Sequence, residues 1–237
     1  MTKTLPLPPR AVTAISPAPA TALHALDSEI VACRKCPRLV AYREKVAREK
    51  RRAFREWEYW GKPVPGFGDP RAKLFLLGLA PGAHGSNRTG RMFTGDRSGD
   101  FLYEALERAG FANQALSSHR QDGLTLKNAY MAATLRCAPP ANKPLPSELS
   151  NCRPYLEREL RLLKNLRVVV ALGRIAFDTY LSLINQHAKF GHNLVHAFSP
   201  ILIASYHPSQ QNTSTGKLTA KMLREVFERA RSLSGVE

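Results

Sequence analysis

The chain has 237 residues and carries 35 Lys and Arg against 19 Asp and Glu, which gives a formal net charge of +16. It is long enough for one sizeable core, and no apolar run approaches the roughly 18 residues of a membrane-spanning helix. Such a surplus of positive charge indicates a polyanionic partner, because binding to phosphates releases counterions and speeds encounter. We therefore exclude a membrane-spanning protein and expect a monomer that binds nucleic acid rather than a membrane surface.

Residues 1–24 are rich in Pro and Ala and lack the continuous apolar stretch of a secretory signal. They are expected to form a disordered tail ahead of a single domain at 25–237, with a short helix at 23–32. Because nothing indicates secretion, we expect a cytoplasmic location. The cysteines Cys33, Cys36, Cys137 and Cys152 are then better explained as metal ligands than as disulfides.

A charged segment at 39–59 favours a helix, and its many Arg and Lys residues are interrupted by Glu44, Glu49 and Glu56. Two interpretations stay open. The cations could form a solvated helix face with ion pairs four residues apart, or they could face phosphates. An aromatic, turn-rich link at 57–66 follows.

A glycine-rich loop at 78–99 lies between an expected buried strand at 72–77 and an expected helix at 100–109. Its glycines let the backbone approach a ligand closely, and strand-to-helix loops are where open α/β sheets bind ligands. The loop has neither GxxxxGK[ST] nor GxGxxG, so it matches no common phosphate-binding pattern.

The rest of the chain alternates apolar runs with helical patterns. Strands are expected at 129–135, 167–172 and 201–205, and helices at 147–166, 174–186 and 216–232. Prolines between 139 and 144 exclude regular structure there. This alternation predicts a three-layer α/β/α fold with a mainly parallel sheet.

The four cysteines have a spacing that suits a tetrahedral thiolate site. Cys33 and Cys36 form a CxxC pair, and Cys137 and Cys152 follow far along the chain. Zinc and a [4Fe–4S] cluster both accept four thiolates, so the spacing alone does not choose between them. In either case the site would tie the N-terminal segment to the loop after the 129–135 strand.

Four motifs in this order resemble the uracil-DNA glycosylase superfamily, and within it the type-5 branch found in bacteria and archaea. They are the 78–82 segment GLAPG, the 90–96 segment GRMFTGD, the cysteine spacing, and His207-Pro208-Ser209 followed by Asn212. The resemblance covers roughly residues 33–223. It implies a four-stranded parallel sheet, a DNA groove along the carboxyl edge of that sheet, and a [4Fe–4S] cluster rather than zinc. It also implies that the protein associates with the nucleoid through DNA.

The implied activity is hydrolysis of the bond between a deaminated base and its sugar in DNA, after the nucleotide is flipped out of the duplex. The backbone of 78–82 would approach the sugar and base, Phe93 would stack on the base, and Asn142 would contact base or water. Asp96 would stabilise positive charge on the sugar or activate water, and His207 would hydrogen-bond the base oxygen. The predicted substrate-binding residues are thus Gly78, Leu79, Ala80, Pro81, Gly82, Phe93 and Asn142.

Further residues are expected to bind the DNA strand. Ser209 and Asn212 belong to a segment expected in the minor groove, whereas Ser86, Asn87 and Lys217 are expected near phosphates. No lysine is marked as a nucleophile, so we expect simple hydrolysis without strand cleavage. The alternatives are a non-catalytic, metal-stabilised nucleic-acid-binding protein and, less favoured, a nucleotide hydrolase.

Two positions depart from the related type-4 enzymes. Leu79 stands where those enzymes have a glutamate, and Ala133 stands where they have an asparagine that pairs with the edge of uracil. Without that amide the pocket should accept a wider range of bases, so uracil, hypoxanthine and xanthine are all expected substrates.

Overall fold

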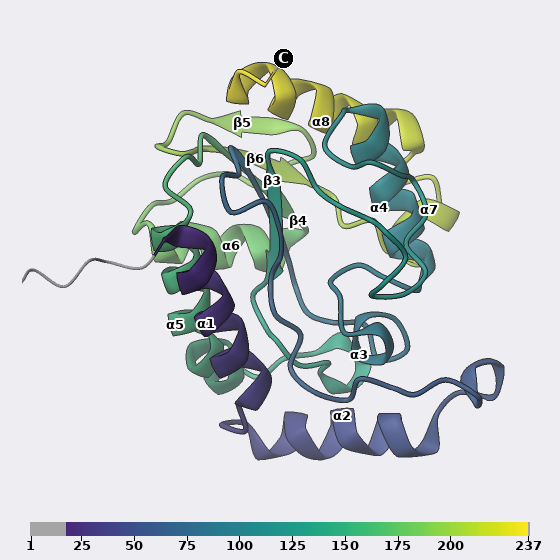
Figure 1. The fold of residues 1–237 in the computed structure, drawn as a ribbon. Coiled ribbons are helices and arrows are strands. Elements are labelled where there is room, and N and C mark those ends of the chain that lie inside the picture. Colours follow the sequence, from purple (N-terminus) through teal and green to yellow (C-terminus); the bar gives the residue numbers. More distant parts are fainter. Residues whose placement is uncertain (1–17, 237) are drawn as a thin grey trace, which may run out of the picture.

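A central sheet with the strand order β1-β3-β2-β4-β6-β5 organises the computed structural model, which describes residues 18–236 (Figure 1). Its middle strands, β2 (Leu74–Gly78), β3 (Ala129–Ala133), β4 (Val168–Leu172) and β6 (Ile201–Ser205), run parallel to one another. Nearly every residue in these four is buried, as expected for strands covered on both faces.

Two short antiparallel strands extend this core at its edges. They are β1 (Phe67–Gly68), which pairs with β3, and β5 (Leu194–His196), which pairs with β6. The sheet therefore has six strands, and the expected four-stranded sheet is only its parallel centre. Strands of two and three residues are too short to produce a period in the sequence, so the pattern could not indicate them.

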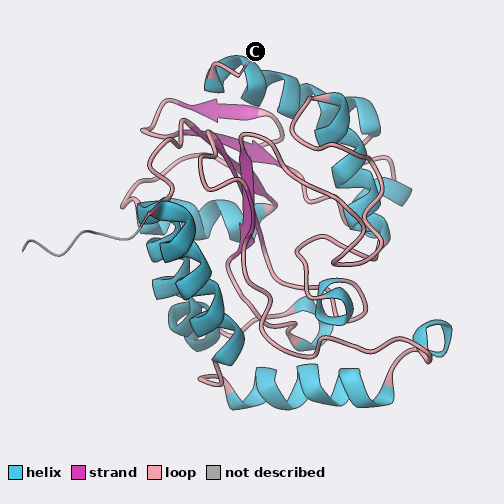
Figure 2. Cartoon of the chain, in the orientation of Figure 1, coloured by secondary structure: helices cyan, strands magenta, loops and turns pink. Residues whose placement is uncertain are grey.

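Helices cover both faces of the sheet, which confirms the three-layer architecture (Figure 2). One face packs Leu74 and Leu76 against α4 (Arg97–Arg108) and α8 (Ala220–Ser234). The opposite face packs Phe75 and Leu77 against α1 (Pro19–Ala32), α5 (Pro146–Leu162) and α6 (Arg174–Leu183).

The helix boundaries differ from the expected ones mainly at the N-terminal end. Helix α1 begins at Pro19, so the expectation of a disordered tail is wrong for 18–24, and residues 1–17 lie outside the described part of the chain. Proline suits a first helical position because its fixed φ matches the helix. Leu23 and Leu26 are buried by this packing.

The charged segment at 39–59 is not one helix. Helix α2 (Pro37–Glu49) ends at Lys50, whose φ of 53° lies in the left-handed region, and the short turn η1 (Arg52–Phe54) follows it. Lys45 and Glu49 form an exposed ion pair four residues apart, as the solvated-face interpretation expects. Arg43, by contrast, is buried.

Three short helical turns lie in the loops at the carboxyl edge of the sheet. They are α3 (Ser86–Thr89) after β2, η2 (Pro140–Asn142) after β3 and α7 (Gln210–Ser214) after β6. The longer helices that follow β2 and β3, α4 and α5, pack on opposite faces of the sheet. Their connecting loops consequently diverge and leave a crevice between them, which is where open α/β sheets bind ligands.

Across residues 18–236, no helix combines the length and the apolar character that crossing a membrane would require.

Candidate active site

Loops that follow three of the parallel strands meet around a cavity of about 360 Å³. This cavity opens beside a wider hollow of about 770 Å³, and both are lined by Gly82, Asp96, Asn142 and Ser209. The structure thus brings together residues that are far apart in the sequence. The complete lining of the smaller cavity is Leu79, Ala80, Gly82, Ser86, Met92, Phe93, Asp96, Ser98, Asn142, His207, Ser209 and Gln211.

Phe93 is held in a special backbone conformation at the wall of the cavity. Its φ of 50° is left-handed, which is uncommon for an aromatic residue. A Cβ at Gly78 would lie 2.8 Å from the Phe93 ring, so only glycine at 78 leaves room for the ring. The ring centroid lies 5.9 Å from that of His207, with the planes tilted by 32°. Together these rings form the aromatic part of the wall.

Asp96 both caps a helix and lines the cavity. Its carboxylate accepts a hydrogen bond of 3.0 Å from the backbone N–H of Gly99 at the start of α4. Its second oxygen lies against Gly82 and Gly85, where a side chain would collide with it. Burial raises the pKa of this carboxyl above its usual range, although the amides of Gly99 and Ser98 act in the opposite direction.

His207 follows β6 and is held as a neutral imidazole. Burial lowers its pKa to about 4, because removing a charged ring from water is unfavourable. A neutral imidazole retains one N–H donor. Asn212 donates from its amide to the backbone carbonyl of His207 at 2.9 Å, so in this structure it fixes the His207 loop.

The residues expected at phosphates have different surroundings. Asn87 is fully buried, and its amide donates to the backbone carbonyl of Arg43 at 3.3 Å. This placement gives Asn87 a packing role and does not support the expected phosphate contact. Ser86 is also buried, but it lies on the cavity wall. Lys217 is exposed, with its amino group 5.0 Å from the centre of the Tyr206 ring.

The two positions that depart from type-4 enzymes are both at the carboxyl edge. Leu79 is on the cavity wall and supplies an apolar side chain there. Ala133 is 1% exposed and lies opposite Gly78 in the β2–β3 register. It does not line the cavity itself, but it belongs to the core cluster against which Phe93 packs. A larger side chain at 133 would therefore press toward Phe93.

All four cysteines line one small cavity among α1, α2, α5 and the loop after β3. Leu39 and Leu135 pack against them, and Arg43 donates to the sulfur of Cys137 at 2.9 Å. Four thiols with an apolar shell and an N–H donor to sulfur suit an iron–sulfur cluster. Within residues 18–236 no three His, Cys, Asp or Glu side chains are close enough to hold a metal as they stand. Ligation would require the thiolates to draw inward.

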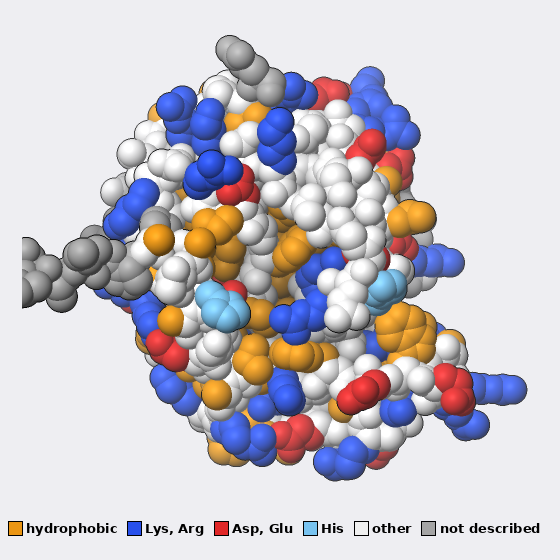
Figure 3. Space-filling model, viewed as in Figure 1, with side chains coloured by type: hydrophobic (Ala, Val, Ile, Leu, Met, Phe, Trp, Pro, Cys, Tyr) orange, Lys and Arg blue, Asp and Glu red, His pale blue; other side chains and the backbone are white. Residues whose placement is uncertain are grey.

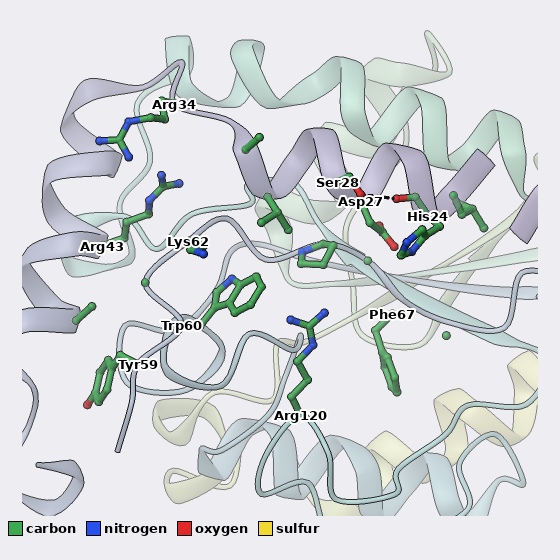
Figure 4. Close-up of a pocket in the computed structure, with 18 of the residues that line it drawn as sticks. His24, Asp27, Ser28, Arg34, Arg43, Tyr59, Trp60, Lys62, Phe67 and Arg120 are labelled. Atoms are coloured by element: carbon green, nitrogen blue, oxygen red, sulfur yellow. Dashed lines mark hydrogen bonds between the residues drawn. The ribbon is translucent and has the colours of Figure 1, made fainter. Parts of the chain in front are cut away.

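A hollow larger than both the smaller cavity and the wider hollow lies elsewhere. A groove of about 1080 Å³ runs between α1, α2 and the 59–68 segment, and Figure 4 shows Trp60, Lys62 and Arg120 within it. None of the predicted site residues lines this groove. On the face seen in Figure 3, Lys and Arg side chains are spread around a central hollow instead of forming one patch. Volume alone would therefore have selected a different place from the predicted site.

Three residues that line the smaller cavity or the wider hollow were not among the predicted site residues. Gln211 and Ser98 line the cavity with side chains able to hydrogen-bond. His84 lines the wider hollow, and its Nδ1 lies 3.1 Å from the Tyr59 hydroxyl. The sequence showed that these residues belong to the motif loops, but the direction of their side chains depends on how the loops fold together.

The parallel sheet, with a cavity at its carboxyl edge lined by the Phe93 ring, the Asp96 carboxylate and the His207 imidazole, defines the class of α/β proteins that bind ligands at this edge. Residues 65–231 match the family model described as the Uracil DNA glycosylase superfamily, and the chain belongs to this superfamily.

Three relatives share most of their length with it. A type-5 uracil-DNA glycosylase of Thermus thermophilus is 53% identical over 219 residues, which cover 90% of this chain and 99% of the relative. One of Mycobacterium bovis is 50% identical, covering 90% of this chain and 82% of the relative. One of Pyrobaculum aerophilum is 43% identical, covering 88% and 92%. The expected resemblance to the type-5 branch is confirmed.

Proposed function

We propose that this protein removes uracil from DNA by hydrolysing the bond between base and sugar, leaving an abasic site in an intact strand. The observation that carries the proposal is the meeting of Phe93, Asp96 and His207 in one cavity at the carboxyl edge of the sheet. Its relatives named type-5 uracil-DNA glycosylases support the same activity.

The target base must leave the duplex to reach this cavity, because its bond to the sugar is inaccessible within the stack. Phe93 offers a ring face on which any flipped base can stack. Leu79 and Met92 add apolar surface to the same wall. Asn142, exposed at the mouth, would contact the base or a water molecule.

Breaking the bond leaves positive charge on the sugar and negative charge on the departing base. Asp96, as a carboxylate, would stabilise the sugar cation and orient the attacking water. His207, as a neutral donor, would hydrogen-bond the base oxygen as its negative charge grows. Both groups are held before the substrate arrives, one by the start of α4 and the other by Asn212.

We extend the proposal to hypoxanthine and xanthine. Neither Leu79 nor Ala133 provides a polar group that would read one base edge, so stacking and ease of flipping would decide which bases are removed. A site that hydrogen-bonds a particular edge rejects other bases because its own groups are left unpaired.

The DNA strand would lie across the wider hollow. Ser209, which begins α7, and the neighbouring Gln210 and Gln211 are at its rim. The excess of cations would draw the strand in from solution. We include a monomeric state and a cytoplasmic, nucleoid-associated location in the proposal.

Cys33, Cys36, Cys137 and Cys152 would hold a [4Fe–4S] cluster. When bound, the cluster would supply a structural cross-link between the α1–α2 connection, the loop after β3 and α5. The bond-breaking groups lie in a separate cavity, so the proposed hydrolysis depends on the cluster only through folding.

Release of free uracil from a duplex containing one uracil tests this proposal. Free base should appear, and the strand should break only after alkali treatment. Binding of the duplex without release of base would instead favour the non-catalytic nucleic-acid-binding protein. Strand breakage without alkali would contradict simple hydrolysis.

A further inference from the structure

Arg88 occupies an unusual position behind the loop that carries Asp96. It is 3% exposed, and its guanidinium donates to the carbonyl of His84 at 2.8 Å and to the carbonyl of Gly95 at 2.6 Å. Gly95 immediately precedes Asp96. One side chain thus joins the first part of the glycine-rich loop to the backbone next to the carboxylate.

Two aromatic side chains hold this guanidinium in place. Its central carbon lies 3.9 Å from the ring centroid of Phe54 and 4.0 Å from that of Trp57. The two rings meet nearly at right angles, so they form a corner around the cation. We call Phe54 and Trp57 the aromatic clamp. It comes from the projecting segment around η1, at the lower right of Figure 1.

The arrangement is poorly explained by stability alone. Burying a guanidinium is unfavourable unless it is paired with a negative charge. Among residues 18–236 Arg88 forms no ion pair, and its Nη1 is buried without a partner. The retained charge and the two directed bonds therefore call for another explanation.

We propose that Arg88 is a positioning residue, which the aromatic clamp holds so that it sets the position and charge of the Asp96 carboxylate through Gly95. The inference rests on the proposed glycosylase activity, and it adds the 54–57 segment to the machinery of that site. A flat, forked side chain suits this task because it can stack on rings and direct two hydrogen bonds at once.

Electrostatics support the same role. Burial raises the pKa of Asp96, and the positive charge of Arg88 acts with the amides of Gly99 and Ser98 to lower it. The other titratable groups around Asp96 are Asp100 in α4, His207 after β6, and His84, Arg51 and Arg97 on the wall of the wider hollow. Burial lowers the pKa of both histidines. Arg51 and Arg97 are exposed cations, whereas Arg88 is buried beside the carboxylate and its charge acts on the Asp96 pKa.

Two substitutions separate geometry from charge. Arg88→Lys keeps the charge but cannot make both hydrogen bonds, so the single-turnover rate on saturating uracil duplex should fall about tenfold or more. The pH midpoint of its rate should stay near the wild-type value. Arg88→Met also removes the charge, so its midpoint should move to higher pH. The DNA Kd should change little in either variant.

The clamp provides a milder test that leaves Arg88 intact. Trp57→Leu removes one of the two rings that hold the guanidinium. Like Arg88→Lys, it should lower the single-turnover rate, while the thermal unfolding midpoint changes only slightly. Phe190→Leu is the matched control, because Phe190 also faces an arginine, Arg174, at 5.9 Å, but does not line the cavity. It should leave the rate unchanged.

A purely structural role for Arg88 would give a different result. Arg88→Lys and Trp57→Leu would then lose thermal stability but keep the wild-type rate and pH midpoint, and that outcome would overturn the inference. Carboxyl NMR titration of Asp96 in wild type and Arg88→Met reads the same coupling without any substrate. A wild-type protein that releases no uracil would contradict the proposed function. An active wild type whose variants keep the wild-type rate and pH midpoint would contradict only this inference.

Discussion

Asp96 shows how one side chain can meet a structural and a chemical demand together. Capping α4 occupies one carboxylate oxygen, and the other is left at the cavity wall between Gly82 and Gly85. Asp96→Asn keeps a capping oxygen and removes the charge. We expect a single-turnover rate lower by about 10²-fold or more with nearly unchanged DNA affinity, as for an interaction made mainly in the transition state.

The same residue should set the acid limb of the pH–rate profile. Its carboxylate form is the active one, so the rate should fall as pH falls through a pKa that burial raises. The Asn variant should lack this limb. A near-normal rate in that variant would leave Asp96 as a helix cap only.

His207 should affect stability in acid. Its folded pKa of about 4 is below the unfolded value of 6.5, so the unfolded state binds more protons between these pH values. Stability should therefore be fully present above about pH 6.5 and decline toward pH 4, by up to about 3 kcal/mol. Denaturant unfolding of wild type and His207→Gln at both pH values would measure this. Equal losses in the two proteins would contradict the assignment.

Ala133 is predicted to affect which damaged bases the protein removes. Ala133→Asn would place an amide on the sheet face where Phe93 packs. If that amide pairs with the edge of uracil, it should favour uracil over hypoxanthine by roughly 1–3 kcal/mol in single-turnover rates. A wild type that acts on uracil alone, or an unchanged ratio in the variant, would show that position 133 does not set substrate breadth.

At the scale of elements, the glycine-rich loop and the start of α4 are built as one unit. Thr94 bonds with Thr89, Arg91 and Ser117, and these contacts fix the loop that carries Phe93 and Asp96. Glycines at 82 and 85 leave room for the Asp96 carboxylate. The loop is therefore a support for two side chains, and its glycines have a steric purpose at these positions.

Gly85→Ala tests this unit. The new methyl group would overlap the Asp96 carboxyl, so the start of α4 must shift, at a cost of about 1–3 kcal/mol in unfolding free energy. The glycosylase rate should fall with it. Gly82→Ala is the graded comparison, because its Cβ would lie 3.0 Å from the same oxygen and should do less harm. The reverse order of effects would contradict this account of the loop.

At the scale of the whole molecule, the cysteines would connect parts that the sheet does not hold. The α1–α2 connection carries Cys33 and Cys36, and its other contacts include a partly buried hydrogen bond from Arg43 to the carbonyl of Cys33. A cluster at this place would fasten the N-terminal helices to the loop after β3 and to α5.

Protein purified without oxygen should therefore be brown and contain about four irons per chain. Replacing Cys137 by Ala should reduce solubility and thermal stability more than it changes base preference. Iron and zinc analysis with the absorption spectrum would check this. Colourless protein holding a single zinc would rule out the iron–sulfur assignment.

The sequence by itself determined the order of elements, the parallel centre of the sheet and the superfamily. These depend on local patterns: buried strands such as Val168–Leu172 are continuous apolar runs, and motif loops keep their residues at fixed spacing. The edge strands were missed because two or three residues cannot form a pattern. The start of α1 was missed because Pro and Ala enrichment resembles a tail.

Only the tertiary structure decided what each motif residue faces. Asn87 and Asn212 looked equally available for DNA, yet one is buried against Arg43 and the other holds the His207 loop. Nothing in the spacing of the glycine-rich loop showed that Arg88 lies between Phe54 and Trp57, behind Asp96. Burial and side-chain direction depend on segments distant in the chain, so local spacing carries no information about them.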